Sequence, residues 1–286
     1  MKRILITGKN SYVGNSLEEW LSQYPKDYEV HKISVRDNQW KEHDFSIYDS
    51  IVHVAGIAHV SRDPKMEELY YKVNRDLTID IAKKAKIEKV PQFIFMSSII
   101  VYGEVVENNG VIDEETKPYP SNFYGKSKLE AEQGIKKLQD DDFKIAIIRP
   151  PMIYGKDSKG NYPKLAKIAR ISPVFPDVNN KRSMLHIDNL SEFLKLMIDN
   201  EEKGLFFPQN KEYVRTSEMV RLIAEAHGKK IYLTKLFSFI LSLLRYKVEL
   251  VNKVFGNLVY EQSLSRYVED YCINDLKKSI ELTERI

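Results

Sequence analysis

Tyr124 and Lys128 stand four residues apart in a segment that has the features of a helix start. Pro120 precedes this segment, and either Ser121 or Asn122 can serve as its N-cap. On a helix, residues four apart lie on one face, so the phenol and the ammonium point the same way. An ammonium beside a phenol favours the phenolate and lowers a pKa that is ordinarily near ~10. The spacing therefore predicts a tyrosine general acid/base, unless both residues only belong to a solvated helix face.

Two serines, Ser97 and Ser98, directly follow a strand-like run over residues 92–96. The carboxyl ends of parallel strands are where α/β sheets bind their ligands, and catalytic residues collect there. The two serines are therefore candidates for contact with a reacting group. The alternative is that they only begin a polar loop.

A glycine-bearing turn follows the first strand-like run, residues 2–7, and a helical pattern follows the turn. Gly8 permits a tight turn, and Gly14 lets the helix pack closely on the strand. The free N–H groups at the helix N-terminus then favour an anion such as a pyrophosphate. Ser11 stands where a middle glycine is expected, and its hydroxyl could itself bond a phosphate. The turn predicts a dinucleotide site, although two glycines at such a turn can also be purely structural.

The second strand-like run, residues 29–35, ends beside Arg36 and Asp37. An acidic residue at this position binds the ribose 2′-OH of NAD, whereas an arginine accommodates the 2′-phosphate of NADP. Both residue types are present, so the choice between NAD and NADP stays open.

Strand-like and helix-like segments alternate along the first part of the chain, which predicts an α/β fold. We expect a Rossmann-type doubly wound parallel sheet in residues 1–155, which also carry the catalytic residues. Hardly any room exists for the usual helix before Ile51. Helical patterns dominate residues 156–286, which predicts a smaller, mostly helical substrate-binding domain, partly interleaved with the first. The expected strands cover residues 2–7, 29–35, 49–56, 92–96 and 144–148, and the expected helices begin near residues 15, 66, 122, 164, 191 and 216.

The expected helix over residues 66–86 has one apolar stripe and one polar residue beside it. Asn74 is either a surface residue or a buried one that bonds the active-site backbone. The stripe consists of Leu69, Val73, Leu77, Ile81 and Ala85.

The composition excludes several classes of protein. The chain has 286 residues and a net charge of only +3, with dispersed basic residues that give no footprint for nucleic acid. The single Cys272 fits a reducing compartment. The N-terminus lacks a signal-peptide pattern, and the longest apolar run, residues 236–244, is well short of the ~20 residues that span a bilayer. From these features we expect a cytoplasmic protein. His53 and His59 lack partners at ligand spacing, so we expect no metal site.

Two features of the second half of the chain allow more than one interpretation. Arg182, in a polar and basic loop, is a candidate for clamping an anionic substrate, or it is simply solvated. The apolar-rich stretch over residues 235–257 is expected to cover the second domain or to form a subunit contact. Basic residues flank this stretch and would also suit an interfacial membrane role, but we expect no membrane association.

Together these motifs resemble those of the extended short-chain dehydrogenase/reductase family, of the NAD-dependent epimerase/dehydratase type. Within that family the chain is similar to UDP-glucose 4-epimerase-like members. The resemblance covers most of the chain and is weakest in its last fifty residues. It rests on Thr7-Gly8 with Gly14, residues 53–56, Ser97-Ser98 with residues 101–103, Tyr124 with Lys128, residues 149–155 and residues 182–190.

The resemblance implies roles for individual residues. Ser98 hydrogen-bonds the sugar C4 oxygen, Tyr124 exchanges the C4 hydroxyl proton, and Lys128 holds the nicotinamide ribose and keeps Tyr124 acidic. The implied substrate contacts are Ser98, Ile99, Tyr124, Asn161 and Arg182. The implied cofactor contacts are Gly8, Asn10, Ser11, Tyr12, Val13, Gly14, Arg36, Asp44, Phe45, Val54, Ala55, Gly56, Asn74, Ser97, Tyr124, Lys128, Pro150 and Ile153.

The activity that this resemblance implies is 4-epimerisation of a nucleotide sugar, a UDP-hexose or a UDP-N-acetylhexosamine, through a 4-keto intermediate. The dehydratases of the family carry an acidic pair directly after the catalytic serine or threonine, where this chain has Ile99 and Ile100, so dehydration is excluded. The alternatives are an NADPH-dependent reductase of a UDP-4-keto-6-deoxy sugar in surface-polysaccharide synthesis, and a non-catalytic cofactor-binding regulatory protein. The cofactor is NAD for the epimerase and NADP for the reductase. The resemblance also implies a homodimer.

Overall fold

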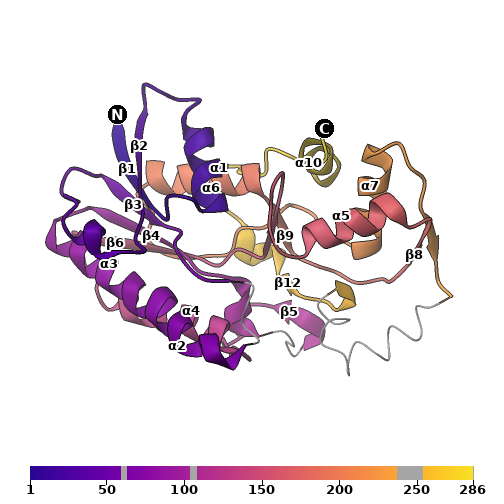
Figure 1. The fold of residues 1–286 in the computed structure, drawn as a ribbon, viewed down its shortest axis with the longest axis horizontal. Coiled ribbons are helices and arrows are strands. Elements are labelled where there is room, and N and C mark those ends of the chain that lie inside the picture. Colours follow the sequence, from indigo (N-terminus) through magenta and orange to yellow (C-terminus); the bar gives the residue numbers. More distant parts are fainter. Residues whose placement is uncertain (59–62, 104–107, 237–253, 286) are drawn as a thin grey trace. The chain divides into compact units, whose positions relative to one another are not determined.

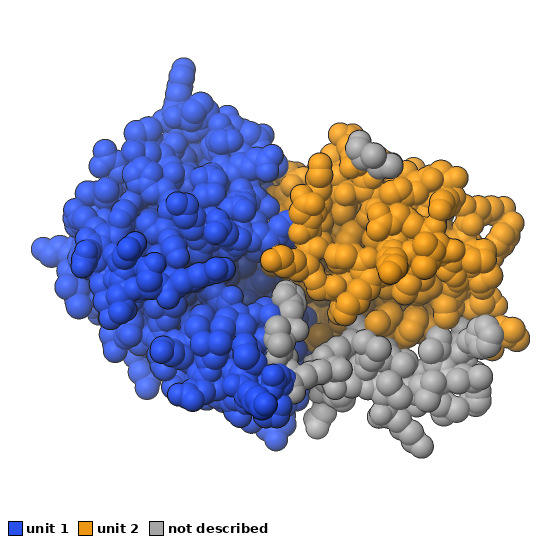
Figure 2. Space-filling view, in the orientation of Figure 1, with its two compact units in different colours: residues 1–103, 117–150, 190–208 blue, residues 104–116, 151–189, 209–286 orange. Residues whose placement is uncertain are grey.

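The computed structural model describes residues 1–58, 63–103, 108–236 and 254–285, which form two compact units (Figure 2). Unit 1 comprises Met1–Gly103, Lys117–Pro150 and Leu190–Pro208, and unit 2 comprises Glu104–Thr116, Pro151–Asn189 and Gln209–Ile286. Residues 190–208 return to the first unit and residues 104–116 belong to the second, so the two units alternate along the chain.

Unit 1 is built on a six-stranded sheet in which every pairing is parallel. The strand order is β10-β6-β4-β3-β1-β2, so successive connections wind outward in both directions from β1 and β3. This arrangement confirms the predicted α/β, doubly wound fold. The strands are β1 (Lys2–Thr7), β2 (Tyr28–Ile33), β3 (Ser50–His53), β4 (Gln92–Met96), β6 (Lys144–Ile148) and β10 (Gly204–Phe206).

Helices cover both faces of this sheet (Figure 1). On one face lie α1 (Tyr12–Leu21) and α6 (Ile187–Asp199), joined where the Trp20 indole donates to Glu192 at 2.8 Å. On the other face lie α3 (Leu77–Ile87) and α4 (Phe123–Lys136). The strand residues facing α3 and α4 are buried aromatic and β-branched side chains, as expected for strands covered on both faces.

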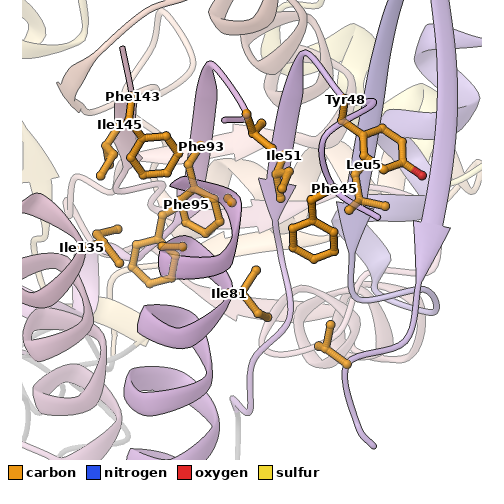
Figure 3. Packing of buried hydrophobic residues seen from close by; sticks show 14 of the residues in the cluster. Leu5, Phe45, Tyr48, Ile51, Ile81, Phe93, Phe95, Ile135, Phe143 and Ile145 are labelled. Carbon is orange, nitrogen blue, oxygen red and sulfur yellow. The ribbon is translucent and has the colours of Figure 1, made fainter. Parts of the chain in front are cut away.

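The connection from β2 to β3 contains no full helix, in agreement with the sequence. One 3₁₀ turn, η1 (Asn38–Lys41), is the only regular element there. The side chains of Trp40, Phe45 and Tyr48 fill the space on the sheet instead, and all three are buried in the core that faces α3 and α4 (Figure 3). Three aromatic rings thus replace a helix, and β2 remains an edge strand.

The helical run after β3 is not one regular helix. It passes through η2 (Pro64–Met66), α2 (Glu67–Tyr70), the π-helical turn η3 (Tyr71–Asp76) and α3. The wider turn shifts the buried face, so the predicted stripe is wrong at its start, where Leu69 is 40% exposed. The buried residues are instead Tyr70, Asn74, Thr78, Ile81, Ala82 and Ala85.

Unit 2 combines helices with three short parallel strand pairs. The pairs are β7 (Met152–Tyr154) with β9 (Met184–His186), β8 (Val174–Pro176) with β11 (Tyr232–Thr234), and β5 (Val111–Ile112) with β12 (Val259–Tyr260). The helices are α5 (Tyr162–Ile171), α7 (Thr216–Ala226) and α10 (Leu276–Thr283), with 3₁₀ turns η5 (Asn108–Gly110) and η6 (Gln262–Ser265). Strands of two or three residues are too short to leave a periodic pattern in the sequence.

Two expectations fall partly on residues that the structure does not describe. Of the apolar stretch 235–257, residues 237–253 lie outside the described chain, and Val254 and Phe255 pack against the core of unit 2. His59 also lies outside the described residues. Among the described helices, none is long and apolar enough to cross a membrane.

Candidate active site

The helix start that carries Tyr124 is set by a cap and a close packing contact. The Asn122 side chain accepts from the Gly125 N–H at 3.0 Å, so of the two expected caps it is Asn122 that closes the helix. A Cβ on Gly125 would come within 2.8 Å of the Ile100 carbonyl oxygen. Only glycine at this position lets the first turn of α4 lie against the 3₁₀ turn η4 (Ile99–Tyr102) that follows β4.

Ser98 begins that 3₁₀ turn and lies beside Tyr124. Its backbone is extended, with φ −166° and ψ 154°, and its Oγ accepts from the Ile100 N–H at 3.3 Å. The same hydroxyl lies close enough to the phenol of Tyr124 to lower the pKa of that phenol. The structure thus brings together two residues 26 positions apart in the sequence that were both expected at the reacting carbon.

Lys128 lies one turn after Tyr124 and is buried. Its ammonium donates to the Met96 carbonyl at 2.8 Å and lies 4.7 Å from the centre of the Phe95 ring. A Cβ on Gly56 would come within 3.3 Å of the Lys128 Nζ, so glycine leaves room for this cation beside the loop after β3. Burial lowers the pKa of Lys128 to about 8, although the nearby Glu132 opposes the shift.

The electrostatic surroundings of Tyr124 differ from the expectation that Lys128 makes it acidic. Burial raises the pKa of Tyr124 to about 12, the nearby Ser98 hydroxyl opposes this rise in part, and the neighbouring Tyr70 adds to it. Lys128 directs its ammonium to the Met96 carbonyl and is not among the groups that shift this pKa. In the protein alone, the tyrosine is therefore a protonated phenol at neutral pH.

The sequence predicts Asn74 to be either a surface residue or a buried one, and in the structure it is buried. Its Oδ1 accepts from the Ile57 N–H at 2.8 Å, and its Nδ2 donates to the Ile57 carbonyl at 3.1 Å and to Ser127 Oγ at 3.2 Å. The π-helical turn places it there. Asn74 thus fixes the loop after β3 to the helix α4 that carries Lys128, and Gly56 lies between them.

A buried ion pair that was not predicted from the sequence stabilises α4, the helix that carries Tyr124 and Lys128. Glu132, one turn after Lys128, receives two hydrogen bonds from Arg149, with Nε to Oε1 at 3.0 Å and Nη2 to Oε2 at 2.5 Å. Ser97 also donates to Glu132, and Arg149 donates to the Tyr102 hydroxyl at 2.7 Å. Tyr124, Lys128 and Glu132 recur at intervals of four, and this spacing could have pointed to Glu132.

The glycine turn after β1 has the geometry that a pyrophosphate needs. Gly8 has φ +117°, and a Cβ there would lie 3.0 Å from the Ala55 nitrogen. At Gly14 a Cβ would meet the Ser11 Oγ at 2.5 Å. Ser11 caps α1 by accepting from the Gly14 N–H at 3.1 Å, so its oxygen serves the helix. The left-handed turn and the N-terminus of α1 fit a dinucleotide phosphate.

The residues expected to discriminate between NAD and NADP lie beyond the end of β2. This strand ends at Ile33, two residues before the predicted end at residue 35. Asp37 caps η1 by accepting from the Gln39 N–H at 3.0 Å. Arg36 is exposed, and its guanidinium makes no hydrogen bond or ion pair with any residue that the structure describes. Of the two, Arg36 is the side chain that is available to a ligand.

Other predicted cofactor residues divide between those near the turn and those elsewhere in unit 1. The Val54 N–H donates to the Thr7 carbonyl at 3.1 Å, which keeps residues 54–56 beside Gly8. The Pro150 carbonyl accepts from the Ile99 N–H at 2.9 Å, so Pro150 adjoins the Ser98 turn. Phe45, in contrast, has its ring in the core and donates its N–H to Glu88 at 2.5 Å, while Asp44 binds Ser46. These contacts of Asp44 and Phe45 belong to the short connection between β2 and β3.

Three predicted residues lie in unit 2. Ile153 is in β7, paired with Leu185. Asn161 precedes α5, and its side chain makes no capping hydrogen bond. The backbone of Arg182 exchanges two hydrogen bonds with Val214, and its Nη1 donates to the Gly256 carbonyl at 3.4 Å.

His53 is a structural histidine in the core of unit 1. Its Nδ1 lies 2.6 Å from Thr7 Oγ1, and its Nε2 lies 3.0 Å from Thr78 Oγ1. Complete burial, together with the charge on Lys128, lowers the pKa of His53 to about 3. In the described parts of the chain, no group of three potential ligand side chains could hold a metal ion.

His53→Gln is expected to flatten the loss of stability in acid. A folded pKa of about 3 lies below the unfolded value, so the free energy of unfolding is highest above ~6.5 and falls as the pH drops toward the folded value. One such group contributes a slope of about 1.4 kcal/mol per pH unit in that window. Urea unfolding of both proteins across the window measures the difference. His31→Gln, at a half-buried position in β2, is the control, and equal slopes for His53→Gln and the unmodified chain would contradict the assignment.

Comparison with known proteins places these features in a family context. The model of the NAD-dependent epimerase/dehydratase family matches residues 4–207. A UDP-glucose 4-epimerase of Vibrio cholerae is 31% identical over 288 residues, which span 90% of this chain and 86% of that protein. The N-acetyl-α-D-glucosaminyl-diphospho-ditrans,octacis-undecaprenol 4-epimerase of Escherichia coli O157:H7 is 31% identical over 69% of this chain and 60% of its own length.

A solved structure shows the same fold at low identity. The dTDP-4-dehydrorhamnose reductase of Bacillus anthracis in complex with NADP superposes with a TM-score of 0.72 at 19% identity, over 98% of each chain. At this identity the likeness concerns the fold.

Proposed function

Because the chain belongs to the NAD-dependent epimerase/dehydratase family, we propose that it is an NAD(P)-dependent 4-epimerase of a nucleotide sugar. The observation that carries the proposal is that Ser98 lies beside the Tyr124 phenol, whose pKa it lowers, with Lys128 buried one turn further along the same helix. The relative from Vibrio cholerae, a UDP-glucose 4-epimerase, supports a UDP-linked hexose as the substrate.

The proposed cofactor site consists of the turn after β1 and the ends of the central strands. Gly8 and the first turn of α1 would hold the pyrophosphate, and Lys128 beside Gly56 would hold the nicotinamide ribose hydroxyls. When bound, the nicotinamide supplies the acceptor and donor of a hydride. Asn74 keeps the loop at Gly56 in place, and hence the space in which the ribose would lie.

Tyr124 is proposed to move the proton of the C4 hydroxyl while Ser98 orients the C4 oxygen. The proton leaves the C4 hydroxyl while a hydride leaves C4, and the product is a ketone. Return of the hydride to the other face of the ketone produces the epimer. With a pKa near 12 the phenol is a ready proton donor to the ketone oxygen. In the opposite direction it needs cations close by, and Lys128 is the buried cation nearest in the helix.

The residues after Ser98 argue against elimination of water. Dehydration at the neighbouring sugar carbons needs acid and base groups beside the serine, and those positions hold Ile99 and Ile100. Ile99 is buried, and neither Ile99 nor Ile100 carries an acid or base group.

Turnover without added cofactor is the expected result for the purified protein. An epimerase regenerates its cofactor in each cycle, so bound NAD⁺ remains with the protein and UDP-glucose and UDP-galactose interconvert in its presence alone. The measurement is mass spectrometry of the co-purified cofactor together with assay of the two sugars. Strict dependence on added NADPH, with stoichiometric consumption, would contradict the epimerase.

A reductase of a UDP-linked 4-keto-6-deoxy sugar is the second candidate. Arg36 favours it, because this exposed guanidinium is suited to a 2′-phosphate while Asp37 is occupied as a cap. In that case Arg36→Ala would weaken NADPH binding and leave NADH binding unchanged. For either activity we propose a cytoplasmic homodimer, which sedimentation of the purified protein would test.

A further inference from the structure

Unit 2 carries a surface on which large apolar side chains are exposed among basic ones. In α5, Ile171 is 72% exposed, and Tyr232 in β11 and Leu236 after it are 60% and 77% exposed. Ile168 and Val174 are exposed to a smaller extent. We call these five residues, with the basic residues Lys164, Lys167, Arg170, Lys229, Lys230 and Lys235, the basic–apolar face.

Several contacts join parts of this face within unit 2. Val174 and Tyr232 are paired across β8 and β11. The Lys229 ammonium donates to the Arg170 carbonyl at 2.5 Å, which joins the end of α5 to the chain entering β11. Lys230 lies 5.2 Å from the centre of the Tyr232 ring. The helices α5 and α7 lie side by side, with β8 next to them (Figure 1).

The charge on this face has one sign. Residues 162–176 and 226–236 contain six lysines and arginines and no aspartate or glutamate, although the chain as a whole has 44 basic and 41 acidic residues. The acidic residues that border these segments are already paired, because Asp177 binds Arg215 and Glu225 binds Arg221. A uniformly basic surface is complementary to an anionic partner.

We propose that the basic–apolar face docks unit 2 onto the surface of an anionic phospholipid membrane. Phospholipid headgroups attract the lysines and arginines, and the exposed isoleucine, leucine and tyrosine side chains enter the boundary between headgroups and acyl chains. A nucleic acid would engage the same cations but offers nothing to Ile171 and Leu236. The inference does not depend on the proposed reaction, since docking is measured without turnover.

Flotation with vesicles tests the proposal. The full chain is expected to float with vesicles made of equal parts phosphatidylcholine and phosphatidylglycerol, to float poorly with pure phosphatidylcholine, and to be released by salt. Ile171→Glu is expected to weaken binding at least ~10-fold, because it removes an exposed apolar side chain proposed to enter the membrane and adds repulsion from the anionic headgroups. Lys167→Ala and Lys230→Ala are each expected to weaken binding about fivefold.

Ile87→Glu is the matched control, because Ile87 is a similarly exposed isoleucine, at 79%, in unit 1. It should bind vesicles like the unmodified chain, and thermal unfolding should show that all variants fold. Equal binding to both kinds of vesicle, or equal effects of Ile171→Glu and Ile87→Glu, overturns the proposal. The proposal is also overturned if the chain does not bind vesicles and Ile171→Glu converts a dimer to a monomer in sedimentation. Binding to an oligonucleotide but not to vesicles overturns it as well.

Discussion

Tyr124→Phe is expected to lower kcat by about 10²–10⁴-fold while leaving cofactor binding unchanged. The substitution removes one hydroxyl and keeps the ring, which packs edge-on against Tyr70 at 5.9 Å. The lost group is the hydroxyl whose pKa the nearby Ser98 lowers, and it is the group proposed to exchange the C4 proton. The measurement is interconversion of UDP-glucose and UDP-galactose, with cofactor binding followed separately by fluorescence.

Tyr119→Phe controls for the loss of a tyrosine hydroxyl in the same region. Tyr119 is 84% exposed in the loop before α4, so its variant should retain full activity. An unchanged kcat in Tyr124→Phe would remove the phenol from the reaction. Loss of cofactor binding in the same variant would give it a structural role instead.

Arg149→Met is expected to destabilise unit 1 by about 3–5 kcal/mol, because it leaves the Glu132 carboxylate buried without its cation. The side chains of Arg149 and Glu132 are only 7% and 5% exposed, and two hydrogen bonds join them. A loss of this size is a large part of the ~5–15 kcal/mol that holds a typical domain folded. Urea unfolding measures the change.

The double variant Arg149→Met with Glu132→Leu should recover most of that loss, since no charge then stays buried. On the same helix, Glu130 pairs with Arg75 at 2.8 Å, but these side chains are 41% and 34% exposed. Glu130→Ala should therefore cost only about 0–1 kcal/mol. A double variant no more stable than Arg149→Met, or an equal cost at Glu130, would mean that the buried charge is not the cause.

The residues predicted at the reacting carbon follow from local rules that can be applied to the sequence alone. A strand end predicts Ser98, and a helix start with spacing of four predicts Tyr124 and Lys128. Parallel strands end at one edge of a sheet, so the fold class alone brings these segments together. Strands β1, β4 and β6 also have the predicted bounds.

Features that depend on tertiary packing could not be predicted in this way. The π-helical turn changes which residues of the helical run face inward, and a regular spacing of 3.6 gives no sign of it. The pKa of Tyr124 depends on which atoms surround the phenol. The partner of Glu132 is Arg149, from a different element, and the core position of Phe45 follows from the aromatic rings that replace a helix.

The division of unit 1 into three chain segments has a consequence for synthesis on the ribosome. Strands β1 to β4 and β6, with the helices α3 and α4, are complete once Pro150 has been added, but most of α6 and all of β10 follow residues 151–189, which belong to unit 2. One face of the nascent sheet therefore lacks α6, and its β6 edge lacks β10, until residues 190–208 emerge. Contacts of such long sequence separation form slowly, and an uncovered sheet in the meantime is prone to aggregate. Residues 104–116 of the second unit are synthesised before the first unit is complete, so the synthesis of the two units overlaps.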